Sequence, residues 1–596
     1  MSIKNKITNA FLVQLLQRIK NELPHYVVKS IYRTIHVSFI LSLIEILSLT
    51  SLFPLINIIL NPAKIQQNTL TREIFHLFNF KNDFTFILTM LVFIILVFIA
   101  KNVAVYFLSK YQINIFYKTA ENLVLEKYRN YMNMPYSEHT DSNSSSLLRN
   151  TLQIPYEFTN NILMPFGAII NELIIITLLA VSIALYSPGI FLSLTCILFP
   201  LVYYYNWSHK KTLQRISEKR DEETLNLYRQ ISQSFEGIRE FIVFDKKNFF
   251  YKSLRKSASN FTEISSESFL ISHISPKVIE TLAVFALFIV FLSGFIQGKP
   301  IEDIASVLIM YAVALYKLIP SINKILLSLN NIRVADYTFN YLKKQTASEQ
   351  PPNEAPIVLA FAKEINIKDL DFYYSGSEKL VLSNINLKIQ KGSKIGIIGP
   401  SGSGKSTLLN ILLRLFNETA GGIYIDNTKI TAENVKALYQ IIGYVPQNIT
   451  IIEGTLLENV AFGIDKNFID MDLFKTVIEK SQLSVFLNEL PQGPHTQLGE
   501  RGVKISGGQK QRIGIARALY HKAQILIFDE ATSALDYETE KMLTESISAF
   551  SGKDITVIIV AHRLQTLKYC DCVYKLENGR LDPRPFKYEE IFSEKP

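Results

Sequence analysis

Long apolar runs dominate the first half of the chain, and polar stretches of unequal length separate them. Six runs are long enough to cross a bilayer as helices, near residues 35–60, 84–108, 162–186, 189–207, 276–296 and 302–326. After about residue 360 the pattern changes to short β-rich runs, such as KIGIIG, ILIFDE and TVIIVAH, which alternate with helical stretches. This change predicts a membrane all-α region of six helices followed by an α/β domain.

The basic residues between the apolar runs predict the orientation of the chain. Twelve Lys and Arg lie in 208–275, five in 109–158 and six before Thr34, whereas the loops 61–83, 187–189 and 297–301 hold four in total. The positive-inside rule places both termini and both long loops in the cytoplasm. We expect a multi-pass protein of the inner membrane. We expect a transmembrane domain over 1–340, a Pro-rich and Glu-rich linker over 341–359 and the α/β domain over 360–596.

Composition argues against a nucleic-acid partner and against structural cysteines. The net charge of +9 does not require a nucleic-acid partner, because membrane topology accounts for the basic loops, and 48% hydrophobic residues indicate a membrane protein. The three cysteines form neither a disulfide framework nor a zinc site. We expect Cys570 and Cys572 to lie along a strand rather than to bind a metal.

A phosphate-binding loop follows the apolar run SKIGIIG. The sequence GPSGSGKST has the required glycine and lysine spacing, although a glycine-rich turn without a ligand is the alternative. Backbone N–H groups and the start of a helix would hold phosphate oxygens, Lys405 would reach the β and γ phosphates of ATP, and Ser406 would coordinate Mg²⁺. The candidate nucleotide contacts are Gly399, Pro400, Ser401, Gly402, Ser403, Gly404, Lys405, Ser406 and Thr407.

Two acidic residues end the apolar run ILIFDE. Asp529 would hold Mg²⁺ through water, and Glu530 would act as the base that polarises the attacking water. An acidic strand end without a role is the alternative. The position of these residues downstream of a phosphate-binding loop favours the nucleotide site.

The segment ISGGQKQR resembles the signature motif of ATP-binding cassette (ABC) proteins, with Ile505 in place of the commoner leucine. In that family the signature binds the γ-phosphate of ATP held by the opposite subunit. The resemblance implies this role for Ser506, Gly507, Gly508 and Gln509.

Other segments match ABC motifs in the same order along the chain. Tyr374 matches the aromatic residue that stacks on adenine, although an ordinary strand tyrosine is the alternative. Gln447 matches the Q-loop, which implies contact with Mg²⁺ and the reacting water, Ser533–Asp536 matches the D-loop, and His562 matches the switch histidine.

The domain order resembles ABC exporters and implies a half-transporter that works as a homodimer, because one chain supplies one phosphate-binding loop and one signature. A heterodimer is the alternative. The exporter fold implies short coupling helices near Pro135 and near Gly237–Lys246, and a contact segment at Gly499–Gly502. Solvated charged turns are the alternative for these segments.

Four lysines lie in the predicted cytoplasmic halves of the membrane segments: Lys101, Lys277, Lys317 and Lys324. A charge inside a bilayer costs several kcal/mol or more unless it faces water or a partner. A basic cavity would favour a substrate with a phosphate or pyrophosphate head group. The alternatives are lysines that extend to the interface and neutralisation by Glu45, Glu172 and Glu280.

Two segments, SFILSLIEILSLTSLFPLINIIL and YAVALYKLIPSINKILLSLNNI, resemble the first and sixth helices of PglK-type lipid-linked oligosaccharide flippases. That family has cavity arginines for the lipid pyrophosphate where this chain has lysines, and an external amphipathic helix that Leu70–Phe80 matches. The resemblance implies ATP-driven transport of a lipid-pyrophosphate-linked glycan to the outer leaflet. A lipid A or multidrug exporter and a non-transporting ABC protein are the alternatives.

Overall fold

The computed structural model describes residues 11–51, 55, 58–59, 69–78, 80, 82–186, 188–298, 301–343, 359–377, 379–499, 505–529, 555–561 and 564–593. The chain divides into two compact units. One unit contains residues 1–134 and 138–348, and the other contains residues 135–137 and 349–596. Each unit has hydrophobic clusters of its own.

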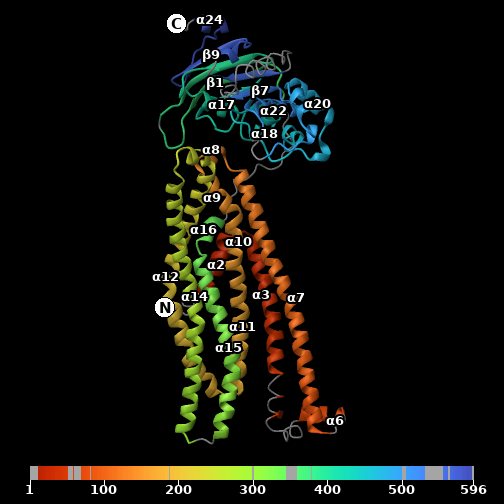
Figure 1. Cartoon of the computed structure of the whole chain (residues 1–596), viewed down its shortest axis with the longest axis vertical. Coiled ribbons are helices and arrows are strands. Elements are labelled where there is room, and N and C mark those ends of the chain that lie inside the picture. The colour runs from red at the N-terminus through yellow and green to blue at the C-terminus, as the bar shows by residue number, and fades with distance from the viewer. Residues whose placement is uncertain are drawn as a thin grey trace. The chain divides into compact units, whose positions relative to one another are not determined.

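Long helices form the first unit (Figure 1). They are α3 (His25–Thr50), α7 (Asp83–Met132), α11 (Met164–Tyr186), α12 (Pro188–Glu236), α14 (Lys247–Ile296) and α15 (Ile301–Val334). Each predicted apolar segment lies in one of these helices, except that the first is described in α3 only as far as Thr50 and the third begins two residues before α11. Within the described ranges, four helical stretches are apolar and long enough to cross a membrane: His25–Ser48, Asp83–Met132, Ser144–Val181 and Lys247–Ile296.

Three of these helices are longer than a bilayer is thick. Helices α7 and α14 have 50 residues each and α12 has 49. At about 1.5 Å per residue they span roughly 75 Å, against about 30 Å for the hydrocarbon layer. They therefore extend well beyond the membrane, as the long polar loops predict.

The approach to α11 is a helix interrupted twice by π-turns. It consists of α9 (Ser144–Leu148), a π-turn at Arg149–Gln153, α10 (Ile154–Phe158) and a second π-turn at Thr159–Leu163. The Arg149 side chain is fully buried and forms an ion pair with Asp221 of α12. The Tyr341 hydroxyl also bonds to Asp221, at 3.0 Å. This network fixes the first π-turn against two other helices.

Short helices occupy the predicted loop positions. Helix α6 (Thr69–Leu77) covers most of the predicted external amphipathic segment, and its Phe75 packs on Phe86 of α7 with ring centroids 5.5 Å apart. Helices α8 (Tyr136–Asp141) and α13 (Ile238–Val243) lie where coupling helices are expected. Their helical structure is present, and their coupling role stays a prediction. The remaining short helices are α2 (Phe11–Glu22) and α16 (Thr338–Leu342).

The second unit contains two sheets. The antiparallel sheet has the order β2-β1-β4-β5, and the larger sheet has the order β10-β9-β3-β8-β7-β6. The strands are β1 (Glu364–Phe372), β2 (Leu382–Gln390), β3 (Lys394–Ile398), β4 (Ala420–Ile425), β5 (Thr428–Lys429), β6 (Ile442–Val445), β7 (Ile525–Asp529), β8 (Thr556–Val560), β9 (Cys572–Glu577) and β10 (Arg580–Leu581). Cys572 begins β9, as expected, but Cys570 lies before the strand, so the expectation that both cysteines lie along it is wrong for Cys570. Both are free thiols.

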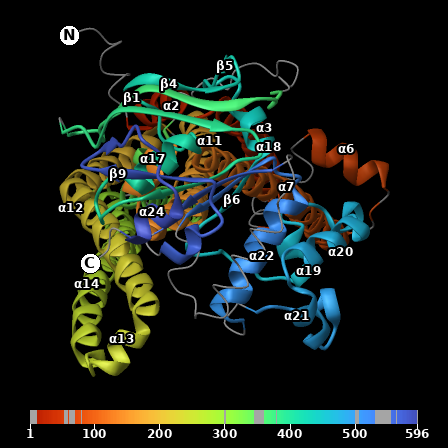
Figure 2. The same cartoon turned by 90° about the horizontal axis from the view of Figure 1, so that it is seen from above.

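Helices pack on the larger sheet, and four of them form a separate group within this unit. Figure 2 shows α19, α20, α21 and α22 together, apart from β1, β4 and β5. The helices are α17 (Lys405–Leu412), α18 (Val435–Ile441), α19 (Leu456–Val460), α20 (Met471–Lys480), α21 (Ser484–Glu489), α22 (Gly507–Tyr520) and α24 (Tyr588–Ser593). One apolar cluster joins the two sheets around α17, and a second joins the larger sheet to α22. These clusters hold α17 and α22 at fixed positions.

Candidate functional site

The loop between β3 and α17 has a backbone that only glycine fits. Gly402 and Gly404 have φ angles of +80° and +103°, which side chains rarely adopt. A Cβ atom at Gly399 would lie 2.1 Å from the backbone oxygen of Leu576. The structure therefore explains three glycines of the predicted phosphate-binding loop.

Two polar side chains of this loop are buried within it. The Lys405 ammonium donates hydrogen bonds to the carbonyls of Gly399 and Pro400, at 2.8 and 2.9 Å. The Ser403 hydroxyl is buried and has no hydrogen-bond partner in the described part of the chain. Buried hydroxyl groups normally have a partner. A phosphate oxygen would supply one, so the loop fits a nucleotide phosphate.

Asp529 lies at the same edge of the larger sheet as this loop. Strands β3, β8 and β7 are parallel neighbours, and Val560 pairs with Ile397 on one side and Asp529 on the other. The carboxyl ends of parallel strands form the usual ligand site of such sheets. The topology therefore places Asp529 on β7, which β8 alone separates from β3, the strand that leads into the loop.

Tyr444 is a further residue at this edge that the sequence motifs did not indicate. Its hydroxyl donates to the Asp529 carboxylate at 3.3 Å. Burial raises the pKa of Tyr444, and the Asp529 charge raises it further, so the hydroxyl stays protonated as a donor. The available signal was its place on β6, three residues before Gln447.

The oxygen donors at this site suit Mg²⁺. Ser406, Asp529 and Gln447 offer a hydroxyl, a carboxylate and an amide oxygen, and Mg²⁺ prefers such ligands together with water and phosphate. Among the described residues, no group of three or more His, Cys, Asp or Glu could hold a metal alone. These donors therefore fit a metal that arrives with a nucleotide.

Tyr374 lies beside the phosphate-binding loop. Its hydroxyl shares a hydrogen bond of 2.9 Å with the hydroxyl of Thr407 on α17. Its ring meets Phe416 edge-on, with centroids 5.5 Å apart. Tyr374 is 40% exposed, so part of the residue remains available for contact with a base.

Ser506 and Gln509 cap the start of α22 reciprocally. The Gln509 N–H donates to the Ser506 hydroxyl at 3.3 Å, and the Ser506 N–H donates to the Gln509 side chain at 2.8 Å. Ser506 and Gly507 are exposed, whereas Gly508 is buried. The capping box gives the signature segment a fixed shape at an exposed helix N-terminus, which favours anions.

Several predicted residues lie outside the described residues. They are Glu530, His562, Ser533–Asp536 and the segment from Glu500 to Gly502. Their roles stay predictions.

The four lysines of the first unit have partners of different kinds. Lys317 forms an ion pair with Glu45 at 3.2 Å, and Lys324 forms one with Glu172 at 2.7 Å. The remaining two have local contacts: Lys277 pairs with Glu280 at 3.1 Å, and Lys101 lies over the ring of Phe98. The structure thus confirms the alternative in which glutamates neutralise lysines, and any substrate role of these lysines stays a prediction.

Comparisons with known proteins agree with this arrangement of sequence and fold. A family model described as ABC transporter matches residues 382–533, and one described as ABC transporter transmembrane region matches residues 50–313. A solved structure of a bacterial Atm1-family ABC exporter with ATP bound has a TM-score of 0.75. It is 19% identical and covers 94% of this chain and 96% of its own, which shows the fold.

Curated relatives match over different lengths. ATP-dependent lipid A-core flippase 2 of Colwellia psychrerythraea is 28% identical over 73% of this chain and 74% of its own. ABC transporter B family member 29, chloroplastic, of Arabidopsis thaliana is 35% identical over 46% of this chain. The iron-sulfur clusters transporter ATM1, mitochondrial, of Saccharomyces cerevisiae is 42% identical over 37% of this chain. The chain spans less than half the length of these last two relatives, at 44% and 31%.

Proposed function

In domain content and fold the chain is an ABC exporter half-transporter, and from this premise we propose that two copies couple ATP hydrolysis to outward transport of a lipid. The observation that carries the proposal is the phosphate-binding loop, whose buried Ser403 hydroxyl has no partner among the described residues. The signature at Ser506 is exposed. A second copy of the chain would bring its own signature to the nucleotide, which completes two composite sites.

We assign the chemical roles as follows. Lys405 holds the β and γ phosphates, while Ser406, Gln447 and Asp529 hold Mg²⁺, which neutralises charge on the phosphates when it is bound. Glu530 polarises the attacking water, and His562 contacts the γ-phosphate. The signature set, Ser506, Gly507, Gly508 and Gln509, completes the site of the opposite copy.

The proposed substrate is a lipid-linked oligosaccharide that moves from the inner to the outer leaflet, with both termini of the protein cytoplasmic. Two arguments support an anionic glycolipid: the cations Lys317 and Lys324 at membrane depth, and a relative named as a lipid A-core flippase. The ion pairs add a condition. The substrate phosphate must replace Glu45 and Glu172 as the partner of these lysines.

The test is ATP-dependent flipping by purified protein in liposomes that contain a lipid-linked oligosaccharide. Lys317→Gln should lower flipping about tenfold or more while basal ATPase survives, because charge-assisted contacts are worth roughly 1.5–3 kcal/mol. Glu45→Gln breaks the same ion pair but keeps the cation, so it should retain transport. Lys110→Gln, at an exposed lysine of α7 outside the set of four, is the control for loss of charge.

Two results decide between the alternatives. If Lys317→Gln and Glu45→Gln lower flipping equally, the ion pair has a structural role and Lys317 does not bind the substrate. Absence of flipping by the wild-type protein, with a lipid A or a hydrophobic drug moved instead, would replace the proposed substrate by the lipid A or multidrug alternative.

A further inference from the structure

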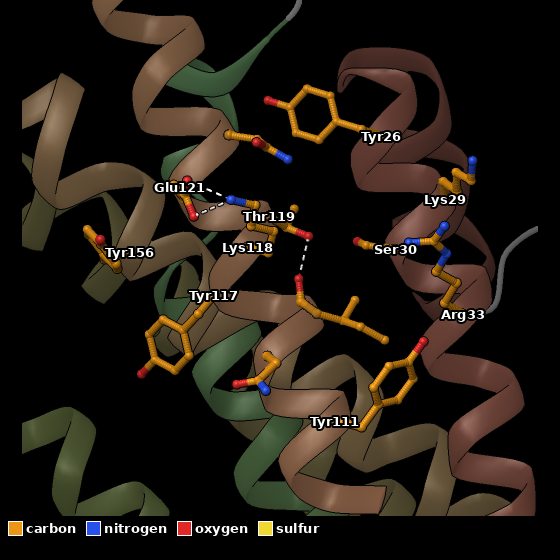
Figure 3. A pocket seen from close by; sticks show the side chains of 13 residues that line it. Tyr26, Lys29, Ser30, Arg33, Tyr111, Tyr117, Lys118, Thr119, Glu121 and Tyr156 are labelled. Atoms are coloured by element: carbon orange, nitrogen blue, oxygen red, sulfur yellow. Dashed lines mark hydrogen bonds and ion pairs between the residues drawn. The ribbon is translucent and has the colours of Figure 1, made fainter.

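A cavity of about 780 Å³ lies in the first unit between α3 and α7. Tyr26, Lys29 and Arg33 line it from α3, and Tyr111 and Lys118 line it from α7 (Figure 3). None of the four lysines discussed above lines this cavity. The cavity is therefore a second cluster of basic side chains in the first unit, distinct from the four lysines.

The cations of this cavity exceed its anions. Lys29 and Arg33 are four residues apart on one helix, so they share a face. Within the described ranges, neither forms a hydrogen bond or an ion pair. Lys118 is paired with Glu121, at 2.7 and 2.8 Å to the two carboxylate oxygens (Figure 3). Lys29 and Arg33 thus differ from Lys317 and Lys324, which both have carboxylate partners.

Polar groups of the wall are arranged around these two cations. The Ser30 hydroxyl donates to the Val27 carbonyl at 2.7 Å, and the Thr119 hydroxyl donates to the Ile115 carbonyl at 2.8 Å. Tyr26 donates to Glu126 at 2.7 Å. These groups are occupied by the protein itself. In the part of the chain that the structure describes, the positive charge of the cavity that no carboxylate pairs with is that of the Lys29 ammonium and the Arg33 guanidinium.

The cavity lies near the cytoplasmic face in the predicted topology. Lys29 and Arg33 are in the first turns of α3, which begins at His25, and Lys118 lies toward the far end of α7, which ends at Met132. Both ends are cytoplasmic by the positive-inside rule. Basic pockets between membrane helices on this side suit phosphate head groups, and tyrosines suit the interface.

We propose that this cavity binds the phosphate of a lipid in the cytoplasmic leaflet. Arg33 is a bidentate hydrogen-bond donor to the phosphate, and Lys29 supplies a second positive charge. The proposal rests on the proposed function in one respect: the transported glycolipid is one source of that phosphate. A bulk anionic phospholipid is the other source. Arg33 matches a phosphate with two parallel N–H bonds, whereas Lys29 provides a point charge.

The test measures lipid bound to the full-length protein by native mass spectrometry after titration with two probes, phosphatidylglycerol and a lipid-linked oligosaccharide. Lys29→Gln/Arg33→Gln should bind at least one probe about tenfold or more weakly. The matched control is Lys20→Gln/Lys110→Gln, which removes the same charge at exposed cations of the same unit outside the cavity. Lys29→Arg should bind as the wild type does, which separates lost charge from a damaged fold.

The outcomes separate this site from the transport proposal. Weaker binding of the oligosaccharide lipid alone identifies the transported lipid as the ligand, and weaker binding of phosphatidylglycerol alone identifies a bulk lipid. Unchanged binding of both probes, or an equal loss in the control, overturns the cavity site even if the wild type flips lipid. A wild type that flips nothing overturns the proposed function, yet a selective loss of bound lipid would still support the cavity.

Discussion

Lys324 and Glu172 offer a quantitative test of the membrane ion pairs. Their charged atoms are 2.7 Å apart, and the side chains are 53% and 6% exposed. Lys324→Gln would leave a buried carboxylate without its cation, and breaking a buried pair in this way costs about 3–5 kcal/mol. The lysine is half exposed, so solvent screens part of the interaction. We therefore expect a coupling energy of about 2 kcal/mol between the two side chains.

A double-mutant cycle isolates this value. Lys324→Gln and Glu172→Gln are made singly and together, and the free energy of unfolding is measured by denaturant titration in mixed micelles. The double variant should be more stable than the sum of the single losses predicts, by about 2 kcal/mol. The pair Lys277 and Glu280 is the matched control, because its side chains are 76% and 53% exposed and should show no measurable coupling.

One result would refute the reasoning. If Lys324 and Glu172 show no more coupling than the exposed control pair, whose coupling is not measurable, burial of Glu172 does not strengthen its interaction with Lys324. A substrate could then bind Lys324 without the loss of a protein partner. The requirement that the substrate phosphate replace Glu172 would no longer hold.

Three further predictions concern the ATP-binding domain. Glu530→Gln should keep nucleotide binding but lower ATP hydrolysis by about two orders of magnitude or more, and near-normal turnover would remove Glu530 from the role of base. Mixing Lys405→Ala chains with Ser506→Arg chains should restore hydrolysis above either parent, and crosslinking of Ser506 to the opposite phosphate-binding loop would show whether a silent mixture still assembles. Contacts with Lys466 and Thr455 lower the pKa of Glu458 to about 2 from 4.5. Its contribution to stability is therefore complete above pH 4.5 and is lost as the pH falls toward 2, so Glu458→Gln should lower hydrogen-exchange protection of α19 at pH 7 but not near pH 2.

Local motifs made the nucleotide site predictable. The phosphate-binding loop needs Gly399, Gly402 and Gly404 for backbone reasons within a few residues of Lys405, so the sequence alone places these contacts. Asp529 follows from its position at the end of an apolar strand. Tyr444 was not predictable from a motif, because its contact with Asp529 joins residues 85 apart and depends on the pairing of β6 with β7.

The membrane residues were harder to interpret for the same reason. Hydropathy located the helices, but the partner of Lys317 is 272 residues away and is chosen by helix packing. The sequence could only name Glu45 as one of several candidates. The cavity of Lys29 and Arg33 gave a signal in their spacing of four residues, yet those cations also satisfy the positive-inside rule, so topology alone accounted for them.

The bonds of Lys405 within the phosphate-binding loop bear on how a nucleotide binds. Its ammonium bonds to two carbonyls of the loop, so contacts of the protein itself give the loop a defined shape. Binding then requires an exchange of partners by one side chain and little ordering of backbone, which keeps the entropy loss small. In a calorimeter, nucleotide binding should release heat without the large unfavourable entropy of a loop that folds around its ligand. The rate of association would accordingly be governed by diffusion and side-chain exchange.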